Sequence, residues 1–286
     1  MTGGSGFIGS KLNSLYPEKF ITKDPATNCD FRNGFSISKD YIKKNNINSV
    51  LLLGGLTKFS FIRKHPDEAF DVNVNKIKKT INCLIDKNIH LVFISSESVF
   101  SGEKGLYSEN DCPNPIFIYG MMKFLIENYI EENFNKDKYT IIRTTKVYDR
   151  NPINPSLFKD SISFLGRKIP YPVISDIYTN PIEISTLSRF IYQICDRNIS
   201  GKFHLGGSEV VSRKDIIDNV NSKLSQYSLN KLKIDAEYTQ SKNLESFKYL
   251  PKNTSLNSKY TRGIMHFEQD SILTDIDNYI KEKFLV

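Results

Sequence analysis

The chain has 286 residues, of which 39% are hydrophobic and 25% charged, enough for one large α/β domain or for a domain with a smaller lobe. Its 39 basic and 32 acidic residues leave a net charge of +7, and because they are scattered rather than gathered into a basic stripe, we expect no nucleic-acid partner. The four cysteines lie far apart, which predicts no bound metal and a reducing, cytoplasmic setting. No apolar run approaches ~18–20 residues and no signal segment is found, so we expect a cytoplasmic protein with no membrane partner.

The chain opens on a glycine-rich segment in which Gly3, Gly6 and Gly9 follow the pattern GxxGxxG. A dinucleotide-binding loop needs residues without Cβ for a tight turn, for close approach of the pyrophosphate and for packing of the next helix. Leu12 and Leu15 continue at helical spacing, which favours such a loop over a flexible glycine-rich end. The residues we expect to bind a cofactor here are Gly3, Ser5, Gly6, Phe7, Ile8 and Gly9.

The strand that should precede this loop is largely missing from the chain, because only Met1 and Thr2 stand before it and a strand usually has about five residues. Three explanations stay open: a start further upstream, a version of the chain that lacks the strand, or impaired cofactor binding. Further on, residues 20–24 take the position of the second strand. Asp24 lies about where an acidic residue binds a ribose 2′-hydroxyl, whereas Lys23 would suit a 2′-phosphate, so NAD and NADP both stay open.

Short apolar runs then alternate with amphipathic stretches through the first half of the chain. The runs at 49–53, 90–95 and 139–143 are short, continuous and aliphatic, which is typical of buried parallel strands. Two stretches, 67–88 and 119–134, carry apolar side chains close to helical spacing. This alternation predicts an α/β fold with a Rossmann-type, doubly wound parallel sheet over residues 1–150.

The pattern changes after Tyr148, where residues 151–155 form a turn-rich junction. We expect helices at 184–196 and 213–224, whereas residues 225–260 are polar and stay unassigned. The second half, residues 151–286, is therefore predicted to form a smaller C-terminal α+β lobe, from which a segment at about 174–196 returns to the first domain.

Tyr119 and Lys123 form a YxxxK pair, which on a helix places the two side chains one turn apart on the same face. A lysine ammonium favours the tyrosinate and lowers the phenol pKa, so the pair can donate or accept a proton. Three further pairs have this spacing, Tyr227/Lys231, Tyr238/Lys242 and Tyr279/Lys283, so the spacing alone means little. The first pair differs because Ser96 ends a predicted strand upstream, at the edge where such sheets bind ligands. The alternative is a surface Tyr–Lys pair beside a serine that satisfies strand-end backbone groups.

A series of motifs runs in order along nearly the whole chain. They are Thr2–Gly9, His65–Val74, Ile94–Gly102, Tyr107–Glu109, Tyr119–Lys123, Asp176–Pro181, Gly201–Gly207 and Pro251–Ile264. Together they resemble the extended short-chain dehydrogenase/reductase superfamily and, within it, the dTDP-4-dehydrorhamnose reductase-like (RmlD-like) sugar-nucleotide group. Ser96 departs from the threonine commoner in the reductase, and residues 225–250 match no motif of the group.

The resemblance implies an NAD(P)-dependent oxidoreductase that reduces a nucleotide-linked 4-keto-6-deoxy sugar in surface-polysaccharide sugar biosynthesis. It implies that residues 1–150 bind NAD or NADP and that residues 151–286 mainly bind the substrate. In the catalytic set, Tyr119 would deliver the proton, Lys123 would hold the cofactor ribose and Ser96 would orient the carbonyl oxygen. Asp30 is carried over as an adenine contact, and a homodimer is common in the superfamily.

Two other functions stay open. A 4-epimerase would keep the same site with tightly bound NAD, and a non-catalytic RmlD-like subunit would bind or regulate. The missing strand favours the subunit, whereas the intact set of Ser96, Tyr119 and Lys123 argues against it. A dehydratase is disfavoured, because Glu97 is the one carboxylate next to Ser96. We interpret Arg143, at the end of a strand, as a solvated charge rather than a ligand of substrate phosphate.

Overall fold

A computed structural model describes residues 1–22, 37–154, 156–245, 247–265 and 270–285 of the chain. The described chain forms two compact units. The first unit comprises residues 1–100, 112–143 and 187–204, and the second comprises 101–111, 144–186 and 205–286. The predicted division of cofactor binding and substrate binding between residues 1–150 and 151–286 stays a prediction.

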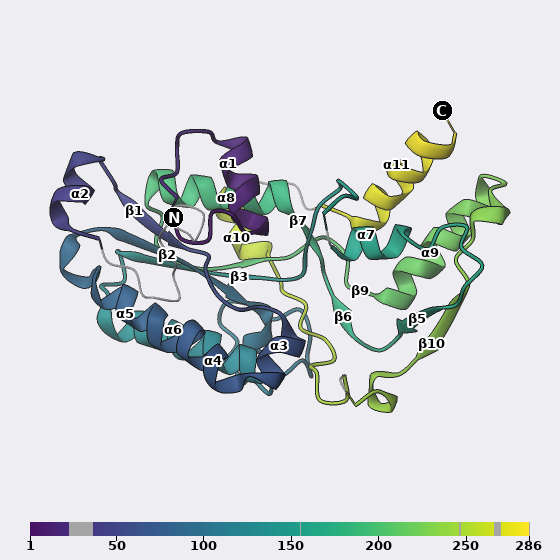
Figure 1. The fold of residues 1–286 in the computed structure, drawn as a ribbon, viewed down its shortest axis with the longest axis horizontal. Helices are drawn as coiled ribbons and strands as arrows, with labels where there is room; N and C mark the ends of the chain where they lie inside the picture. Colours follow the sequence, from purple (N-terminus) through teal and green to yellow (C-terminus); the bar gives the residue numbers. More distant parts are fainter. Residues whose placement is uncertain (23–36, 155, 246, 266–269, 286) are drawn as a thin grey trace. The chain divides into compact units, whose positions relative to one another are not determined.

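The first unit is built on a four-stranded sheet in the order β1-β2-β3-β8 (Figure 1). These strands are β1 (Ser49–Leu52), β2 (His90–Ser96), β3 (Tyr139–Thr144) and β8 (Gly201–Leu205). β1 and β2 are parallel, with Ser49 opposite His90, and every residue of β2 and β3 is buried. Strands buried on both faces explain the continuous apolar runs, because neither face of such a strand meets water. The predicted α/β, doubly wound architecture is confirmed.

Helices cover both faces of this sheet. On one face lie α1 (Phe7–Leu15) and α8 (Ile184–Arg197). Tyr16, which caps the end of α1, stacks on Tyr192 of α8 with ring centroids 3.9 Å apart. On the other lie α4 (Pro66–Phe70), α5 (Ile77–Asn82) and α6 (Ile118–Asn133). Two further short helices of this unit are α2 (Lys39–Lys44) and α3 (Phe59–Lys64). The helix expected at 67–88 contains a π-helical stretch, Asp71–Lys76, and ends in a 3₁₀ turn, Ile85–Lys87.

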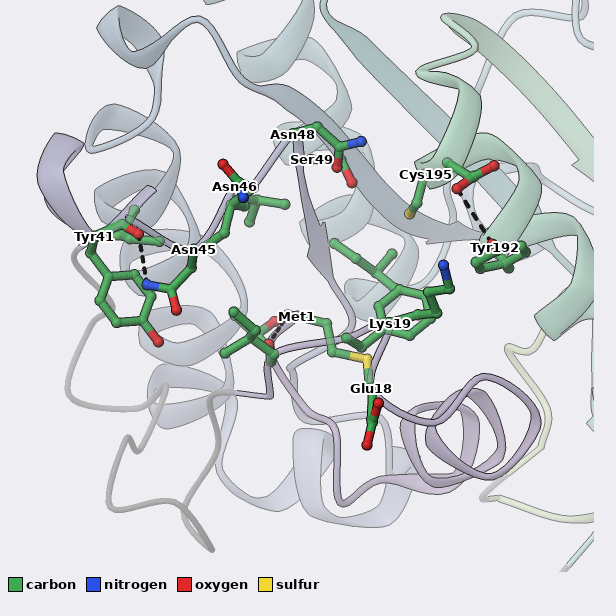
Figure 2. A pocket seen from close by; sticks show the side chains of 18 residues that line it. Met1, Glu18, Lys19, Tyr41, Asn45, Asn46, Asn48, Ser49, Tyr192 and Cys195 are labelled. Atoms are coloured by element: carbon green, nitrogen blue, oxygen red, sulfur yellow. Dashed lines mark hydrogen bonds between the residues drawn. The ribbon is translucent and has the colours of Figure 1, made fainter. Parts of the chain in front are cut away.

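The start of the chain pairs with one edge of β1. Thr2 forms an isolated parallel bridge with Leu52, and its backbone N–H donates to Leu51 O at 3.0 Å. Before this bridge a cavity of about 360 Å³ lies along β1, between Ser49–Leu51 and the segment Phe20–Ile21 (Figure 2). Residues 20–22 are irregular rather than the expected strand. The cavity therefore occupies the place where further residues of a parallel strand would pair with β1.

The second unit combines short strand pairs with a helical core. Its pairs are β5 (Tyr171–Ile174) with β10 (Ala236–Thr239), β4 (Val147–Tyr148) with β7 (Ile182–Glu183), and β6 (Tyr178–Thr179) with β9 (Val211–Ser212). Its helices are α7 (Leu157–Ile162), α9 (Arg213–Gln226), α10 (Lys259–Met265) and α11 (Ile272–Phe284). Buried side chains from α7, α9 and α11 form one apolar cluster with those of β4 and β5.

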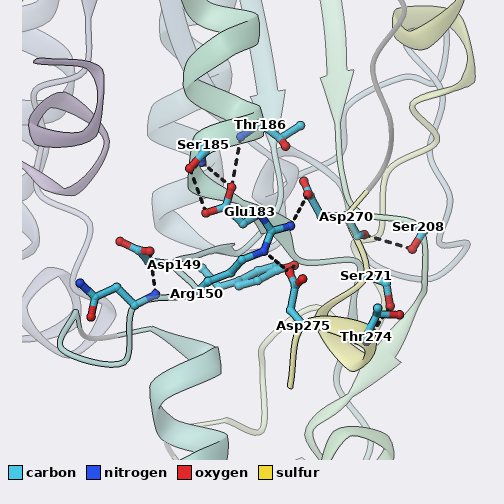
Figure 3. A network of polar contacts seen from close by, with 12 residues as sticks. Asp149, Arg150, Glu183, Ser185, Thr186, Ser208, Asp270, Ser271, Thr274 and Asp275 are labelled. Carbon is cyan, nitrogen blue, oxygen red and sulfur yellow. Dashed lines mark hydrogen bonds and ion pairs between the residues drawn. The ribbon is translucent and has the colours of Figure 1, made fainter. Parts of the chain in front are cut away.

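A polar network ties the start of α11 to the strand β4 in this unit (Figure 3). Arg150 pairs with Asp270 and Asp275, each at 2.9 Å, and Tyr148 donates its hydroxyl to Asp275 at 2.6 Å. Burial, together with the Asp275 carboxylate, raises the pKa of Tyr148 far above its ordinary value. Asp270 and Asp275 thus both pair with Arg150, which makes this network a structural link.

Candidate active site

The glycine loop has the shape that its sequence predicts. Gly3 has a φ of +67°, a conformation that residues with a Cβ rarely adopt. A Cβ on Gly9 would lie 2.4 Å from the Gly3 carbonyl oxygen, so the loop can pack against α1 only with glycine there. Gly6, at the N-cap of α1, donates its N–H to Gly3 O at 3.1 Å and has no side chain to cover the helix end. The helix α1 thus begins at a tight, glycine-lined turn, and the free N–H groups of such a helix N-terminus fit a dinucleotide phosphate.

The loop after β1 borders this cradle. Gly54 lies against Gly3, since a Cβ on Gly3 would be 3.1 Å from Gly54 N. Asn73, buried in the π-helical stretch, accepts from Leu56 N at 2.7 Å and donates to Leu56 O at 2.8 Å. An extra residue in a helix turn shifts its side chains around the axis, and π-helical turns are frequent at functional sites. Here the π-helical stretch aims Asn73 at the loop and fixes the loop beside the glycine segment.

Ser96 lies at the carboxyl end of β2, as predicted, and begins the 3₁₀ turn Glu97–Val99. Its hydroxyl accepts from Ser98 N at 3.2 Å and donates to Glu97 Oε2 at 2.8 Å. The turn is pressed against the start of α6, because a Cβ on Gly120 would lie 1.9 Å from the Ser98 carbonyl oxygen. Glycine at position 120 therefore lets the Tyr119 end of α6 approach the end of β2 directly.

Tyr119 and Lys123 lie one turn apart on α6, and both are buried. Lys123 donates from Nζ to Ile94 O at 2.8 Å, and the same atom lies 4.7 Å from the Phe93 ring centroid and 5.7 Å from that of Tyr119. Phe59, from the first turn of α3, packs 5.7 Å from the Tyr119 ring. The ammonium is thus anchored to the backbone of β2 just before Ser96, between two aromatic rings.

The pKa of Tyr119 differs from the sequence-based prediction. Burial, aided by the nearby Glu97 carboxylate, raises the pKa of Tyr119 well above its ordinary value, so the prediction of a lowered pKa is wrong for the chain as it stands. Burial lowers the pKa of Lys123 to about 8, against the opposing effect of the Glu127 carboxylate. A buried phenol loses the hydration that stabilises its anion, and this cost exceeds the help from a neighbouring ammonium.

The other three Tyr–Lys pairs make different contacts. Lys283 donates to the Tyr279 hydroxyl at 2.8 Å on the exposed side of α11. Tyr227 donates to Asp277 at 2.8 Å, and Tyr238 donates to Asp218 at 2.5 Å. Of the four pairs, the one at Tyr119 is buried beneath a strand end, whereas the others belong to ordinary surface networks.

The sequence analysis missed one charged residue next to this site, Glu127, and misinterpreted another, Arg143. Arg143 on β3 is 1% exposed, so its interpretation as a solvated charge is wrong. It forms a buried ion pair with Glu127 of α6, with Arg143 Nη2 and Glu127 Oε2 2.6 Å apart. The available signals were an arginine inside an apolar strand run and a glutamate one helical turn beyond Lys123.

Asp24 and Asp30, with Lys23, lie outside the described residues. Within the described part of the chain, no group of three or more His, Cys, Asp or Glu side chains is arranged to hold a metal ion. Among the helices that the structure describes, none is both long and apolar enough to cross a membrane.

The family model of the RmlD substrate binding domain matches residues 1–284. The chain belongs to this family. A curated relative, the dTDP-4-dehydrorhamnose reductase of Sinorhizobium fredii, is 25% identical over 167 residues, which cover 56% of this chain and 55% of the relative. The ADP-L-glycero-D-manno-heptose-6-epimerase of Brachyspira hyodysenteriae is 28% identical over 161 residues, covering 48% of this chain and 49% of the relative. This RmlD-family chain thus spans about half the length of the curated relatives it matches.

The fold of this RmlD-family chain is also found among solved structures. The dTDP-4-dehydrorhamnose reductase of Bacillus anthracis in complex with NADP has a TM-score of 0.80 and 21% identity, over 99% of this chain and 98% of that chain. At this identity the likeness establishes the shared fold, including the Rossmann-type first unit.

Proposed function

We propose that this protein is an NAD(P)H-dependent reductase of a nucleotide-linked 4-keto-6-deoxy sugar, acting in the cytoplasm in surface-polysaccharide sugar biosynthesis. The observation that carries the proposal is the buried pair of Tyr119 and Lys123 set against the carboxyl end of β2 at Ser96. The glycine cradle at the start of α1, in the same unit, supports a dinucleotide. The Bacillus anthracis reductase with this fold binds NADP, which supports NADP or NAD as the cofactor.

Each residue of the set has a task in this proposal. A bound nicotinamide dinucleotide supplies the hydride. Tyr119 donates a proton to the oxygen of the substrate carbonyl, and Ser96 orients that oxygen through a hydrogen bond. The Lys123 ammonium holds the cofactor ribose and stabilises the phenolate that Tyr119 becomes after donation. Glycines at positions 3 and 9 let the pyrophosphate approach the N-terminus of α1.

The direction of the Tyr119 pKa supports reduction. A reductase needs its tyrosine protonated before hydride transfer, and burial keeps the proton on Tyr119 at neutral pH. Lys123, with a pKa lowered to about 8, is still charged for the most part at neutral pH. The pair therefore starts in the state from which a proton can be delivered and the resulting anion stabilised.

The test is nicotinamide absorbance over time, with NADPH or NADH and a dTDP-linked 4-keto-6-deoxyhexose. We expect stoichiometric cofactor oxidation by the wild type and a loss of about 10²- to 10⁴-fold in kcat for Tyr119→Phe, the range typical of a positioned proton donor. Tyr279→Phe is the matched control, because it removes the hydroxyl of an exposed Tyr–Lys pair on α11. Equal rates for the two variants would refute the assignment of Tyr119.

A nucleotide-sugar 4-epimerase is the second candidate function. The relation to the Brachyspira hyodysenteriae enzyme, a heptose 6-epimerase, supports an epimerase but does not point to C4. An epimerase retains its nicotinamide and turns over without added reductant. If the wild type consumes neither NADPH nor NADH but the purified protein holds NAD and interconverts a nucleotide sugar, this function replaces the reductase. If neither activity appears and the protein still binds the nucleotide sugar, the non-catalytic subunit is the correct reading.

A further inference from the structure

A buried charged cluster lies directly behind the proposed catalytic set. Glu127 and Arg143 are each 1% exposed and form a two-pronged ion pair, with Arg143 Nε 3.0 Å from Glu127 Oε1 and Arg143 Nη2 2.6 Å from Oε2. Ser95 donates its hydroxyl to Glu127 Oε1, and His204 Nε2 lies 3.3 Å from Arg143 Nη1. All four residues belong to the first unit.

The cluster joins the elements that carry the catalytic set. Glu127 follows Lys123 by one turn on α6, and Ser95 immediately precedes Ser96 on β2. A single carboxylate therefore links the helix that holds Tyr119 and Lys123 to the strand that ends at Ser96. Arg143 ties the same carboxylate to β3, so the helix is fixed against two strands at once.

Stability alone is a weak reason for such a pair. Removing two charges from water costs several kcal/mol per ion, and apolar side chains of similar volume often stabilise a core as well or better. What a directional ion pair supplies is a defined position, because the planar guanidinium donates its N–H groups to the carboxylate in one orientation. Arg143 is itself held in place by the Phe100 ring, whose centroid lies 5.1 Å from Arg143 Cζ.

The Glu127 carboxylate also favours the charged form of Lys123. On α6 the groups near the ammonium are Tyr119 and Glu127, and on β2 they are the Phe93 ring and the Ile94 carbonyl. Farther out, the Glu97 carboxylate acts on Tyr119, and the Arg143 guanidinium, with His204 behind it, is paired to Glu127. Burial lowers the pKa of Lys123 to about 8, and the Glu127 carboxylate opposes this fall.

We infer that Glu127 is a positioning residue, which through Ser95 and Arg143 fixes α6 against β2 and keeps the Lys123 ammonium charged beside Tyr119. This inference deepens the proposed reductase function and rests on it for the kinetic readout. Glu127 acts through Lys123 and Tyr119 rather than by contact with substrate.

The variant Glu127→Gln removes the charge and keeps the shape of the side chain. If activity requires a protonated Lys123, activity falls as pH rises through the pKa of Lys123. Losing a favourable carboxylate lowers that pKa, so we expect the basic limb of the kcat profile to move down by about one pH unit, which is a loss of about fivefold in kcat at pH 8. The control is Glu131→Gln, one turn further along α6, where the carboxylate pairs with Lys202 at the surface, 33% exposed. Its profile is expected to overlay that of the wild type.

Two further variants keep the test decisive if Glu127→Gln folds poorly. Glu127→Asp retains the charge but shortens the reach to Ser95 and Arg143, so kcat should fall while the basic limb stays in place. Ser95→Ala keeps the ion pair and removes one contact to Glu127, so a smaller fall in kcat with an unchanged limb is expected. Wild-type kcat in both variants would overturn the positioning role, and a limb that does not move in Glu127→Gln would overturn the charge role.

A measurement without turnover separates this inference from the proposed function. Lysine labelled with ¹³C at Cε reports the titration of Nζ by NMR, and Lys123→Arg assigns the resonance. A Lys123 titration that moves to lower pH in Glu127→Gln, in a chain that oxidises no nicotinamide, would leave the inference standing while the reductase proposal fails. If Glu127→Gln is an active reductase in which neither the Lys123 titration nor the basic limb moves, the reductase proposal stands and the charge role of Glu127 is refuted.

Discussion

A methyl group at position 9 should disable the cofactor cradle. In Gly9→Ala the new Cβ would lie 2.4 Å from the Gly3 carbonyl oxygen and 2.6 Å from the Gly4 Cα, whereas ordinary contacts begin at 3.4 Å. The oxygen contact is therefore about 1 Å too short, and both neighbours are backbone atoms that cannot rotate away. Overpacking of this kind costs about 1–3 kcal/mol. If the strain is relieved by moving the loop off α1, NADPH affinity should fall by about 5- to 100-fold.

The assay is the dissociation constant of NADPH, from its fluorescence on titration, together with the melting temperature. Gly263→Ala is the matched control, because position 263 lies in the helix α10 with open space around it. Alanine is a better helix former than glycine by about 0.5–1 kcal/mol, so the control should be unchanged in affinity and equal or higher in stability. NADPH binding by Gly9→Ala within about twofold of the control would refute the claim that this cradle holds the cofactor.

Two further predictions concern the Asn73–Leu56 contact and the cavity beside β1, both in the first unit. Asn73→Ala removes both hydrogen bonds to the half-buried backbone of Leu56, at a cost of about 1 kcal/mol per bond, so the melting temperature should fall and KM for NADPH should rise. Asn75→Ala, on the exposed side of the same π-helical stretch, should change neither, and matching values for the two variants would contradict the role of Asn73. About four β-branched residues joined ahead of Met1 should pair with β1 and fill the cavity there, raising the melting temperature by several degrees, since each buried apolar side chain contributes about 1.5–3 kcal/mol. A Gly-Ser extension of equal length is the control, and equal melting temperatures would show that the cavity does not accept a strand.

The regular part of the fold could be predicted because local patterns reflect burial directly. A strand buried on both faces must be apolar throughout, so β2 and β3 stand out in the sequence, and α6 shows its period of 3.6. The π-helical stretch at Asp71–Lys76 could not be predicted this way. Within it Asn73 bonds to Leu56, 17 residues earlier in the chain, and no local pattern records that contact.

The sequence by itself determined the identity of the chemical groups: a glycine cradle at residues 3–9, a strand-end hydroxyl at Ser96, and a phenol and an ammonium one turn apart at Tyr119 and Lys123. The four Tyr–Lys pairs have the same spacing, so the sequence did not show which of them is buried. Only Ser96, at the end of a predicted strand upstream, set the first pair apart.

Only the tertiary structure decided how these groups are charged and held. The buried pairing of Glu127 with Arg143, and the rise in the pKa of Tyr119, both arise because segments far apart in the chain exclude water from the same small volume. Desolvation depends on every neighbour at once, and no local pattern in a sequence records that.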